Sequence, residues 1–551
     1  MRIAISLIYL FSAVIPALGQ VGSNASRQAS RQANAVASAP KLVLVIIVDQ
    51  FRYDFLDRFG DLFVKGGFRR LTGEGALFTN ANYNYIPTYT APGHACVFTG
   101  SVPARNGIVG NTWYDRQTGR VRMMVSDDSA HTVTNNGPST RAGAPSPRVL
   151  IGTTIGDQMR LASNLKSKVI AVSYKDRSAV LPGGQRPNGA YWFDPLSGTF
   201  VTSDYYFKEL PEWVKQFNSS HRPDKYFGAK WERALPPDDY ERAGSGEFPH
   251  TITGGEAKPG SRFYNAFQST PFASEYLADF AEAALEAESL GKDRFPDLLS
   301  ISFSTPDLVG HDRGPDSQEV LDIYVRLDRV IADLLSYVDR RVGRGNVLVV
   351  MTGDHGVSPV PEYISSIGMD AGRISARDIV EAANKALVAR FGEGKWVQGF
   401  VNDQLYLDLQ LIADRKADSA EVERIAGEAA LSVSGIIDYF TRSNITKGQI
   451  QAGPLGRRVM NGFNRARSGD VWLITRPFMF VAEGSLTTTH GSPYNYDTHV
   501  PVIISGPGVR RGHYHEECSP SDVAPTLAVL LNIEPPSNRT GRVLVEALAN
   551  H

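Results

Sequence analysis

Residues Leu42–Asp49 read LVLVIIVD, an apolar run that ends in a carboxylate. An unbroken run of β-branched residues and leucine predicts a strand that is buried on both faces, as in a parallel sheet. Two further runs of this kind, Leu298–Phe303 and Val347–Met351, are also followed by acidic residues. We therefore predict an α/β fold in which a central, mostly parallel sheet is sandwiched by helices and carries inserted cap or lid subdomains.

The segment between the second and third runs supports this fold class. Ser317–Arg341 carries apolar residues at the spacing of an amphipathic helix. A strand, a helix and a strand of these lengths form a parallel crossover unit. Lys168–Tyr174 and Val500–Ser505 are two more strand-like runs.

The chain of 551 residues is long enough for several domain-sized units. We interpret residues 41–371 and 473–551 as one α/β core that the chain leaves and re-enters. Residues 372–472 mix helical and strand-like stretches, which predicts an inserted α+β subdomain. The segments near 116–144 and 194–260 are rich in Gly, Pro, Ser and Tyr and are interpreted as further insertions or lids.

The first 19 residues predict a signal peptide, because a short basic start is followed by an apolar run and then by small residues. The run is shorter than the roughly 20 residues that span a bilayer. Residues 20–40 are rich in Ser, Ala, Gln and Asn, which predicts a disordered linker. We expect a periplasmic or secreted protein with no membrane insertion after cleavage.

The overall charge limits the classes of partner that the protein could bind, and the cysteine content limits its disulfides. A net charge of −1 gives no general attraction to nucleic acid, so no nucleic-acid partner is expected. We expect a monomer that acts on small molecules. Two cysteines, Cys96 and Cys518, leave open whether a disulfide forms, although a buried inert thiol is favoured for Cys96.

Asp and His residues, which commonly bind metals, occur at the ends of the predicted strands, where an α/β sheet places its binding residues. Taken singly, each is explained as well by a helix cap or a surface carboxylate, but together they indicate a metal site. Mixed carboxylate and imidazole ligands favour Zn²⁺ over Mg²⁺ or Ca²⁺, and five or six ligands favour two ions. The candidates are Asp49, the i, i+4 pair Asp307 and His311, the adjacent pair Asp354 and His355, and either His490 or His499.

The sequence PTYTAPGH at residues 87–94 places hydroxyl groups at the start of a helix that Pro92 favours. Thr90 is the candidate nucleophile, because a helix N-terminus binds anions and a nearby divalent cation lowers the pKa of a hydroxyl. The alternative is that Thr88 or Thr90 only caps the helix.

Lys175 and Arg177 follow the Lys168–Tyr174 run and share one face if the strand continues. Two cations on one face match the charge of a phosphate monoester dianion. Asn111 offers an amide donor to a phosphoryl oxygen. A solvated loop and an ordinary turn residue are the alternatives.

Taken together, these motifs resemble the alkaline phosphatase superfamily, in particular its periplasmic PafA-type branch with a threonine nucleophile. The resemblance extends from Asp49 to Val502 and covers nearly all of the mature chain. The motifs that carry it are PTYTAPGH, GIVGNTWYDR, YKDR, STPDLVGH, TGDHG and HGSPYNYDTHVPVI.

The resemblance implies an exported phosphate-monoester hydrolase with two zinc ions. Thr90 would form a phosphothreonine, Asn111, Lys175 and Arg177 would bind the phosphoryl oxygens, and water would release inorganic phosphate, which is also expected to inhibit. Phosphate monoesters are the expected substrates. The implied ligands are Asp49, Asp354, His355 and the Thr90 oxygen for one zinc, and Asp307, His311 and His490 for the other.

Three other functions fit these motifs less well. A sulfatase requires Cys or Ser at position 90, followed by Pro and Arg, and Thr90-Ala91-Pro92-Gly93 has neither feature. A phosphodiesterase or nucleotide pyrophosphatase on the same scaffold is the main alternative, which Lys175 and Arg177 disfavour because such relatives lack this pair. A non-catalytic exported binding protein is disfavoured by the intact Thr90 hydroxyl and ligand set.

Overall fold

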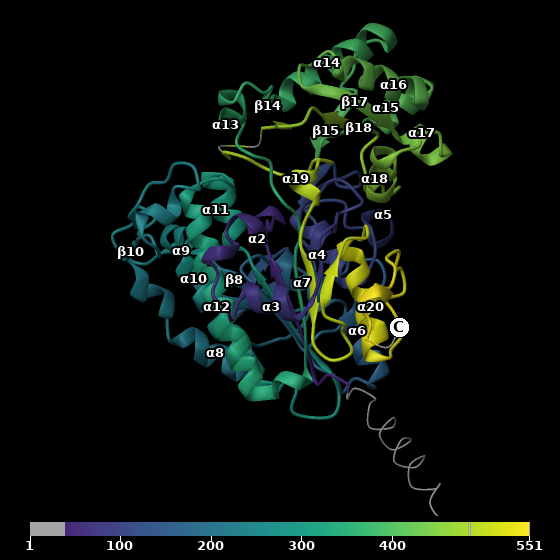
Figure 1. Ribbon diagram of the computed structural model, residues 1–551. Coiled ribbons are helices and arrows are strands. Elements are labelled where there is room, and N and C mark those ends of the chain that lie inside the picture. The colour runs from purple at the N-terminus through teal and green to yellow at the C-terminus, as the bar shows by residue number, and fades with distance from the viewer. Residues whose placement is uncertain (1–38, 483, 485, 550–551) are drawn as a thin grey trace, which may run out of the picture. The chain divides into compact units, whose positions relative to one another are not determined.

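The run that starts with Leu42 forms a central strand of a large mixed sheet, so the predicted α/β class is confirmed (Figure 1). β1 (Leu42–Val48) lies between β12 (Asp297–Phe303) and β13 (Val347–Gly353), parallel to both, and all of its residues are buried. Within the described residues the sheet has eleven strands. In spatial order they are β21 (Gly512–Tyr514), β2 (Ala76–Phe78), β20 (Val502–Ser505), β13, β1, β12, β7 (Val169–Ser173), β8 (Gly189–Asp194), β9 (Thr199–Ser203), β5 (His131–Thr134) and β6 (Gly137–Ala142).

The sheet is parallel at its centre, and an antiparallel pair flanks this centre on each side. β13, β1, β12, β7 and β8 are parallel neighbours. β20 pairs antiparallel with β13, and β9 pairs antiparallel with β8. Strands β5 and β6 continue from β9, so part of the segment 116–144 extends the main sheet.

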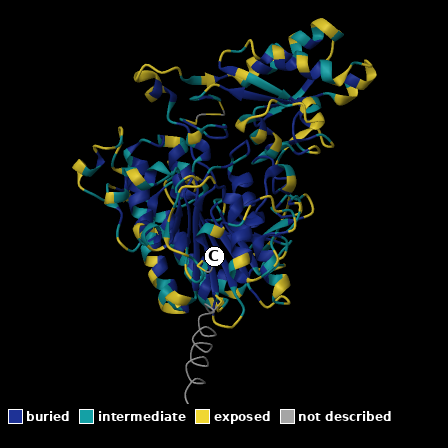
Figure 2. Cartoon of the chain, turned by 45° about the vertical axis from the view of Figure 1, so that its right-hand side comes forward, coloured by how far each residue is buried: buried dark blue, intermediate teal, exposed yellow. Residues whose placement is uncertain are grey.

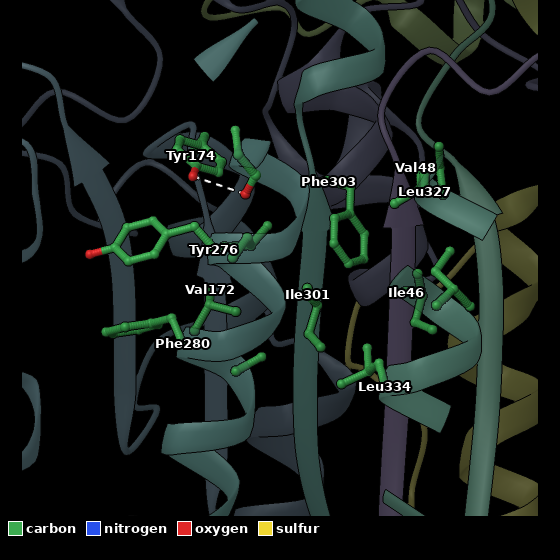
Figure 3. Close-up of a cluster of buried hydrophobic side chains, with 14 of the residues drawn as sticks. Ile46, Val48, Val172, Tyr174, Tyr276, Phe280, Ile301, Phe303, Leu327 and Leu334 are labelled. Atoms are coloured by element: carbon green, nitrogen blue, oxygen red, sulfur yellow. Dashed lines mark hydrogen bonds between the residues drawn. The ribbon is translucent and has the colours of Figure 1, made fainter. Parts of the chain in front are cut away.

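The side chains of β1 alternate between two layers of helices. Leu44, Ile46 and Val48 face α10 (Pro271–Ala287) and α12 (Gln318–Val342). Figure 3 shows this face, with Leu327 and Leu334 of α12 over β1, and Tyr276 and Phe280 of α10 over β7. Val43, Val45 and Ile47 face the opposite layer. That layer consists of α4 (Thr90–Thr99), α6 (Ile155–Ala162) and α20 (Val523–Leu531).

Burial on both faces explains why the central strands read as continuous apolar runs. In Figure 2 these strands are dark blue, and the exposed residues lie on the outer helices and loops. The 25-residue helix α12 presents its apolar positions to the sheet at helical spacing.

Residues 372–481 form a block with its own hydrophobic core. Its antiparallel sheet runs β15 (Val397–Val401), β16 (Gln404–Leu407), β18 (Val471–Thr475) and β17 (Ile436–Thr441). α14 (Ala376–Phe391) and α16 (Ser419–Ala430) share that core. β14 (Gly372–Ile374) and β19 (Met479–Val481) pair in parallel where the chain enters and leaves the block. Its other helices are α15 (Leu409–Asp414), α17 (Arg442–Lys447) and α18 (Pro454–Gly462).

The remaining elements are short and connect the layers. They are α2 (Asp54–Arg58), α3 (Phe68–Glu74), α5 (Pro103–Asn106), α7 (Arg177–Gly183), α8 (Glu212–Ser219), α9 (Ser261–Gln268), α11 (Thr305–Arg313), α13 (Pro361–Ser366), α19 (Asn495–Thr498), and the strand pairs β3 (Thr112–Asp115) with β4 (Arg120–Met123) and β10 (Lys230–Trp231) with β11 (His250–Thr251).

The computed structural model describes residues 39–482, 484 and 486–549. The predicted signal peptide at 1–19 and nearly all of the predicted linker at 20–40 lie outside the described residues. Within the part that is described, no helix is both long and apolar enough to cross a membrane. Cys96 and Cys518 are both buried free thiols, so they do not form a disulfide.

Candidate active site

The carboxyl ends of three neighbouring strands bring three carboxylates together. Asp49 follows β1 directly, Asp354 follows β13 directly, and Asp307 lies in the first turn of α11, just after β12. Each is at most 3% exposed. Since these strands are adjacent and parallel, their carboxyl ends meet at one edge of the sheet. The topology thus joins residues that lie far apart in the sequence.

Three imidazoles complete the cluster. Nε2 of His355 lies 3.4 Å from Oδ1 of Asp49. Nε2 of His311, one turn along α11, lies 3.2 Å from Oδ1 of Asp307, and Nε2 of His490 lies 3.7 Å from the same oxygen. His490 enters from the segment between β19 and α19. All three histidines therefore present the same ring nitrogen to the carboxylates.

A backbone carbonyl orients each of these imidazoles. Nδ1 of all three lies 2.7–2.9 Å from a carbonyl oxygen, which it reaches by donating its proton. The other nitrogen, Nε2, is then an unprotonated ligand atom, the arrangement in which histidine binds metals. The carbonyl acceptors are Gly356 for His355, Thr488 for His311 and Thr88 for His490.

The ligand atoms form two overlapping groups. Those of Asp49, Asp354 and His355 lie within 4.8 Å of one another, and so do those of Asp307, His355 and His490. His355 therefore belongs to both groups. His311 contacts Asp307 but belongs to neither group of three.

Two buried oxygens in the first group lack donors, which fits a bound cation. Oδ1 of Asp49 and Oδ2 of Asp354 accept no hydrogen bond from any residue that the structure describes. Burial, together with the charges of Asp307 and Asp354, raises the pKa of Asp49 well above its usual range. Buried carboxylate oxygens without partners are unfavourable, and a metal ion removes that penalty. The carboxylate and imidazole donor set suits Zn²⁺.

Two of the imidazoles, those of His355 and His490, favour the neutral form that a metal requires. Burial lowers the pKa of His490 well below its usual range, and the nearby His355 and His311 lower it further. Burial also lowers the pKa of His355. Burial lowers the pKa of His311 as well, but the charge of Asp307 outweighs burial and raises it. The rings of His355 and His490 stack with centroids 3.5 Å apart, a contact that two imidazolium ions would oppose.

Thr90 is the first residue of α4, and its hydroxyl lies 3.4 Å from Nε2 of His355. Neither Thr88 nor Thr90 caps this helix, because the N-cap residue is Tyr89 and no side chain caps the helix. Gly93 allows α4 to approach the end of β13, since a Cβ at this position would lie 2.2 Å from the carbonyl oxygen of Asp354. The helix therefore brings a hydroxyl to the cluster of carboxylates and imidazoles.

The three predicted phosphoryl-binding residues lie at the same edge. Oδ1 of Asn111 accepts the Ala91 N–H at 2.9 Å, which leaves its Nδ2 as a donor. Nζ of Lys175 lies 2.6 Å from Asp49 and 2.5 Å from Asp307. Burial lowers the pKa of Lys175, but the charges of these two carboxylates outweigh burial and raise it.

Arg177 reaches this edge in a different way from the one that the strand pattern suggests. β7 ends at Ser173, so the strand does not continue, and Arg177 instead begins helix α7. Nε of Arg177 is buried and has no hydrogen-bond partner among the residues described. A turn into a helix, not a shared strand face, therefore positions the cation.

The sequence did not identify two residues that organise the cluster. Gln50 adopts a left-handed backbone (φ 66°), donates its N–H to Asp354 at 3.1 Å and donates Nε2–H to Asp307 at 2.9 Å. Nδ1 of His94 lies 2.8 Å from the carbonyl oxygen of Thr90 and 3.3 Å from Asp354. The only signal for either was its position, beside Asp49 and within TAPGH.

His499, the other candidate for the last ligand, lies outside the cluster. Its Nε2 is 2.9 Å from the carbonyl oxygen of Thr79, and its ring stacks on Tyr53 with centroids 4.6 Å apart. The structure therefore brings His490, and not His499, to Asp307.

The chain is similar to proteins of known activity over most of its length. The sequence profile of the type I phosphodiesterase / nucleotide pyrophosphatase family matches residues 43–499. Alkaline phosphatase PhoV of Synechococcus elongatus is 38% identical over 92% of this chain and 93% of its own. Alkaline phosphatase PafA of Elizabethkingia meningoseptica is 35% identical over 94% of this chain and 96% of its own.

The likeness extends to the fold. The crystal structure of wild-type PafA matches with a TM-score of 0.86 and 34% identity, covering 93% of this chain and 99% of that one. Another PafA structure has a threonine changed to serine and an asparagine, a lysine and an arginine changed to alanine. The substituted threonine and asparagine are as far apart in sequence as Thr90 and Asn111, and the substituted lysine and arginine are as far apart as Lys175 and Arg177. The chain thus belongs to the type I phosphodiesterase / nucleotide pyrophosphatase family and, within it, to the group that includes the alkaline phosphatases PhoV and PafA.

Proposed function

We propose that this chain is a metal-dependent alkaline phosphatase, a phosphate-monoester hydrolase that uses Thr90 as its nucleophile. The observation that carries the proposal is the Thr90 hydroxyl, which lies 3.4 Å from a ligand nitrogen of His355 inside a buried carboxylate and imidazole cluster. The similarity to PhoV and PafA over more than nine-tenths of the chain supports the same activity.

Two zinc ions fit the ligand set. Asp49, Asp354 and His355 would hold one ion together with the Thr90 oxygen. The other would be held by Asp307, His311 and His490, with His355 close to both groups. When bound, the ions supply positive charge that favours the Thr90 alkoxide and stabilises charge on the leaving oxygen.

The residues of the chain then carry out two displacements. Oγ1 of Thr90 attacks phosphorus, and the bond from phosphorus to the leaving alcohol oxygen breaks, which forms a phosphothreonine. Water next attacks that phosphorus, the bond to Thr90 breaks, and the hydroxyl is restored as inorganic phosphate leaves. Asn111 accepts a hydrogen bond from the Ala91 N–H, and His94 donates one to the Thr90 carbonyl, so both hold the first turn of α4 and Thr90 in place.

Lys175 and Arg177 favour monoesters over diesters. A monoester carries one more negative charge than a diester, and two cations interact with that charge. The PafA structure with four substitutions, at a threonine and asparagine pair and at a lysine and arginine pair that have the same internal spacings, supports a joint role for Thr90, Asn111, Lys175 and Arg177. Diester hydrolysis is the second candidate activity, because the family description covers phosphodiesterases.

The first test is metal dependence. Removal of metal from the purified chain by a chelator should abolish hydrolysis of p-nitrophenyl phosphate, and added Zn²⁺ should restore it. Elemental analysis of the active protein should find two zinc ions per chain. Full activity in protein shown to be free of metal would disprove the proposal.

The second test separates the two candidate activities. The kcat/KM for p-nitrophenyl phosphate should exceed that for methyl p-nitrophenyl phosphate. Lys175→Ala and Arg177→Ala should each lower the monoester value by roughly 10- to 100-fold more than the diester value. Lys208→Ala, at an exposed lysine, is the matched control. Equal losses for both substrates would show that these cations do not recognise the dianion.

We also propose that the protein is exported to the periplasm or secreted, and that it is a monomer. The support for export is the sequence of residues 1–19. Mass spectrometry of the mature protein should find its N-terminus near Gln20, and light scattering should find a single chain. Inorganic phosphate should inhibit competitively, since it occupies the same position as the transferred group.

A further inference from the structure

A cavity of about 540 Å³ lies apart from the metal cluster, at the opposite edge of the main sheet. Its lining includes Arg160 of α6, Gln185 and Arg186 just after α7, and Tyr205 and Tyr206 just after β9. Arg160 donates to the Ser167 carbonyl, shortly before β7 begins. These residues therefore lie at the amino end of β7, whereas the metal ligands follow the carboxyl ends of the neighbouring strands.

The lining is rich in cations. Arg148, Arg160 and Arg186 contribute to it, against one lining carboxylate, Asp204, which already contacts His131. Arg148 pairs with Asp127. The side chain of Arg186 makes no hydrogen bond or ion pair with a residue in the described part of the chain. An anion in the cavity would thus meet the guanidinium of Arg186, which forms no ion pair with a carboxylate in the described part of the chain.

Two buried atoms of the lining are hydrogen-bond donors without acceptors. Nε of Arg160 and the hydroxyl of Tyr206 are both buried and have no partner among residues 39–482, 484 and 486–549. Burial raises the pKa of the Tyr206 hydroxyl, so it stays a donor. Burial lowers the pKa of Arg160 and the charge of Arg186 lowers it further, and together they outweigh the opposite effect of Asp157.

We propose that this cavity binds a small polyanion, a molecule with two or more phosphate, sulfonate or carboxylate groups, through Arg160, Arg186 and Tyr206. Oxyanion groups would supply the acceptors that the buried donors lack, and guanidinium groups bind them with two parallel hydrogen bonds. The volume is that of a small-molecule site and exceeds the size of one tetrahedral anion. The ring of Tyr205, which packs 5.1 Å from the Arg148 guanidinium, forms an aromatic part of the wall.

The test uses the fluorescent polyanion 1,3,6,8-pyrenetetrasulfonate, which a phosphatase cannot hydrolyse, and the zinc-loaded full chain. Its anisotropy should show saturable binding to the wild-type protein. Arg186→Gln should weaken binding about tenfold or more without disturbing the fold, since this exposed side chain has no protein partner. Arg160→Gln should weaken it similarly, and Arg141→Gln, an exposed arginine on β6 with the same loss of charge, should not.

Tyr206→Phe should fold like the wild type, because it removes only a hydroxyl that lacks a hydrogen-bond partner among the described residues. Its melting temperature should be unchanged or higher, while its affinity for the probe falls severalfold. The kcat/KM for p-nitrophenyl phosphate should stay at the wild-type value in Arg186→Gln and Tyr206→Phe, which separates this site from the catalytic one.

The requirement for several charges is tested by displacement. Benzene-1,3,5-tricarboxylate should displace the probe at concentrations at least about tenfold lower than sulfate does. Failure of the wild-type protein to bind the probe, equal affinity in the wild type and both arginine variants, or equal displacement by sulfate would each overturn the proposal. Absence of phosphatase activity would leave these binding results unaffected.

Discussion

At the scale of single residues, the geometry of the cluster depends on neighbouring side chains that form hydrogen bonds with the candidate ligands, as well as on the ligands themselves. Gln50 donates to two of the three carboxylates, one through its backbone and one through its side chain. Its side chain fits because position 310 is glycine, where a Cβ would lie 1.7 Å from its amide oxygen. Such supporting hydrogen bonds fix ligand geometry and tune affinity for the ion.

The role of Thr90 is tested most directly by removing its hydroxyl. Thr90→Ala should lower kcat/KM for a phosphate monoester by roughly 10³-fold or more, because the nucleophile is lost. Thr90→Ser should lower it by less than about 100-fold, since the hydroxyl remains but its position is less restricted. Thr99→Ala, at the other end of the same helix, is the control. Steady-state kinetics at matched zinc content would reject the nucleophile role if Thr90→Ala stayed as active as Thr90→Ser.

A second prediction at this scale concerns pH and Asp497. Burial raises the pKa of Asp497 to about 7, and its Oδ1 has no hydrogen-bond partner in the described chain. A raised pKa means that the folded protein binds this proton more tightly than the unfolded chain, whose carboxyl titrates near pH 4. The stabilisation is therefore complete below about pH 4 and is lost as the pH rises to about 7.

Asp497→Asn should lack this loss. Relative to the wild type, its free energy of unfolding should rise between pH 4 and pH 7 by up to about 4 kcal/mol. Urea unfolding across this range measures the difference, and Asp128→Asn, at an exposed carboxylate, is the control. A difference that does not change with pH would show that Asp497 titrates normally.

At the scale of elements, the site depends on how closely helix α4 approaches the end of β13. His94 bonds to Ser302 of β12 at 2.8 Å and contacts Asp354, so one buried side chain ties the helix to two strands. Gly93 faces the Asp354 backbone at a distance that no side chain would allow. The position of the Thr90 hydroxyl therefore follows from the packing of a whole helix.

Gly93→Ala should push α4 away from β13. The added Cβ would lie 2.2 Å from the Asp354 carbonyl oxygen, and a displacement of about 1 Å at a reacting group lowers the rate roughly 100-fold. Gly73→Ala, in helix α3 with no atom within 4 Å of the added Cβ, is the matched control and should stabilise the protein by up to about 1 kcal/mol. Kinetics and thermal unfolding would contradict this account if the two variants behaved alike.

At the scale of the whole molecule, the block at residues 372–481 is joined to the core by buried charge. Asp470 accepts hydrogen bonds from Arg116 at 2.8 Å and from Arg442 at 2.6 Å, and also from the Leu407 N–H at 2.7 Å. Arg116 belongs to the core segment between β3 and β4, whereas the other three residues belong to the block. One carboxylate thus holds the block's own sheet and its contact with the core.

Asp470→Ala should destabilise the protein by about 3–5 kcal/mol, because two guanidinium groups and a buried N–H lose their acceptor. Glu381→Ala breaks an exposed i, i+4 pair with Arg377 and should cost less than about 0.5 kcal/mol. Denaturant unfolding monitored by circular dichroism measures both changes. Comparable small effects in the two variants would show that Asp470 does not join the two parts.

Much of the fold was predictable from local patterns. The apolar run at Leu42–Val48 predicted β1 residue for residue, and the amphipathic pattern of Ser317–Arg341 predicted α12 to within one residue at each end. Short strands such as Ala76–Phe78 and Thr199–Ser203 were missed, because a few residues carry no clear period. They form because neighbouring strands supply hydrogen bonds, which the sequence of the short strand itself does not reveal.

Residue type and position in the chain were enough to indicate carboxylates and imidazoles at strand ends, a hydroxyl at a helix start, and cations after a strand, because these follow from local periodicity. The sequence did not predict which of these groups lie within contact distance. The stacking of His355 on His490, the choice of His490 over His499 and the bridging by Gln50 arise when parallel strands align their ends. The cavity around Arg160 and Arg186 is also invisible in the chain order, because its walls come from segments that meet only on folding. Contacts between residues hundreds of positions apart are settled by the packing of the sheet and its helices, and local sequence does not encode them one by one.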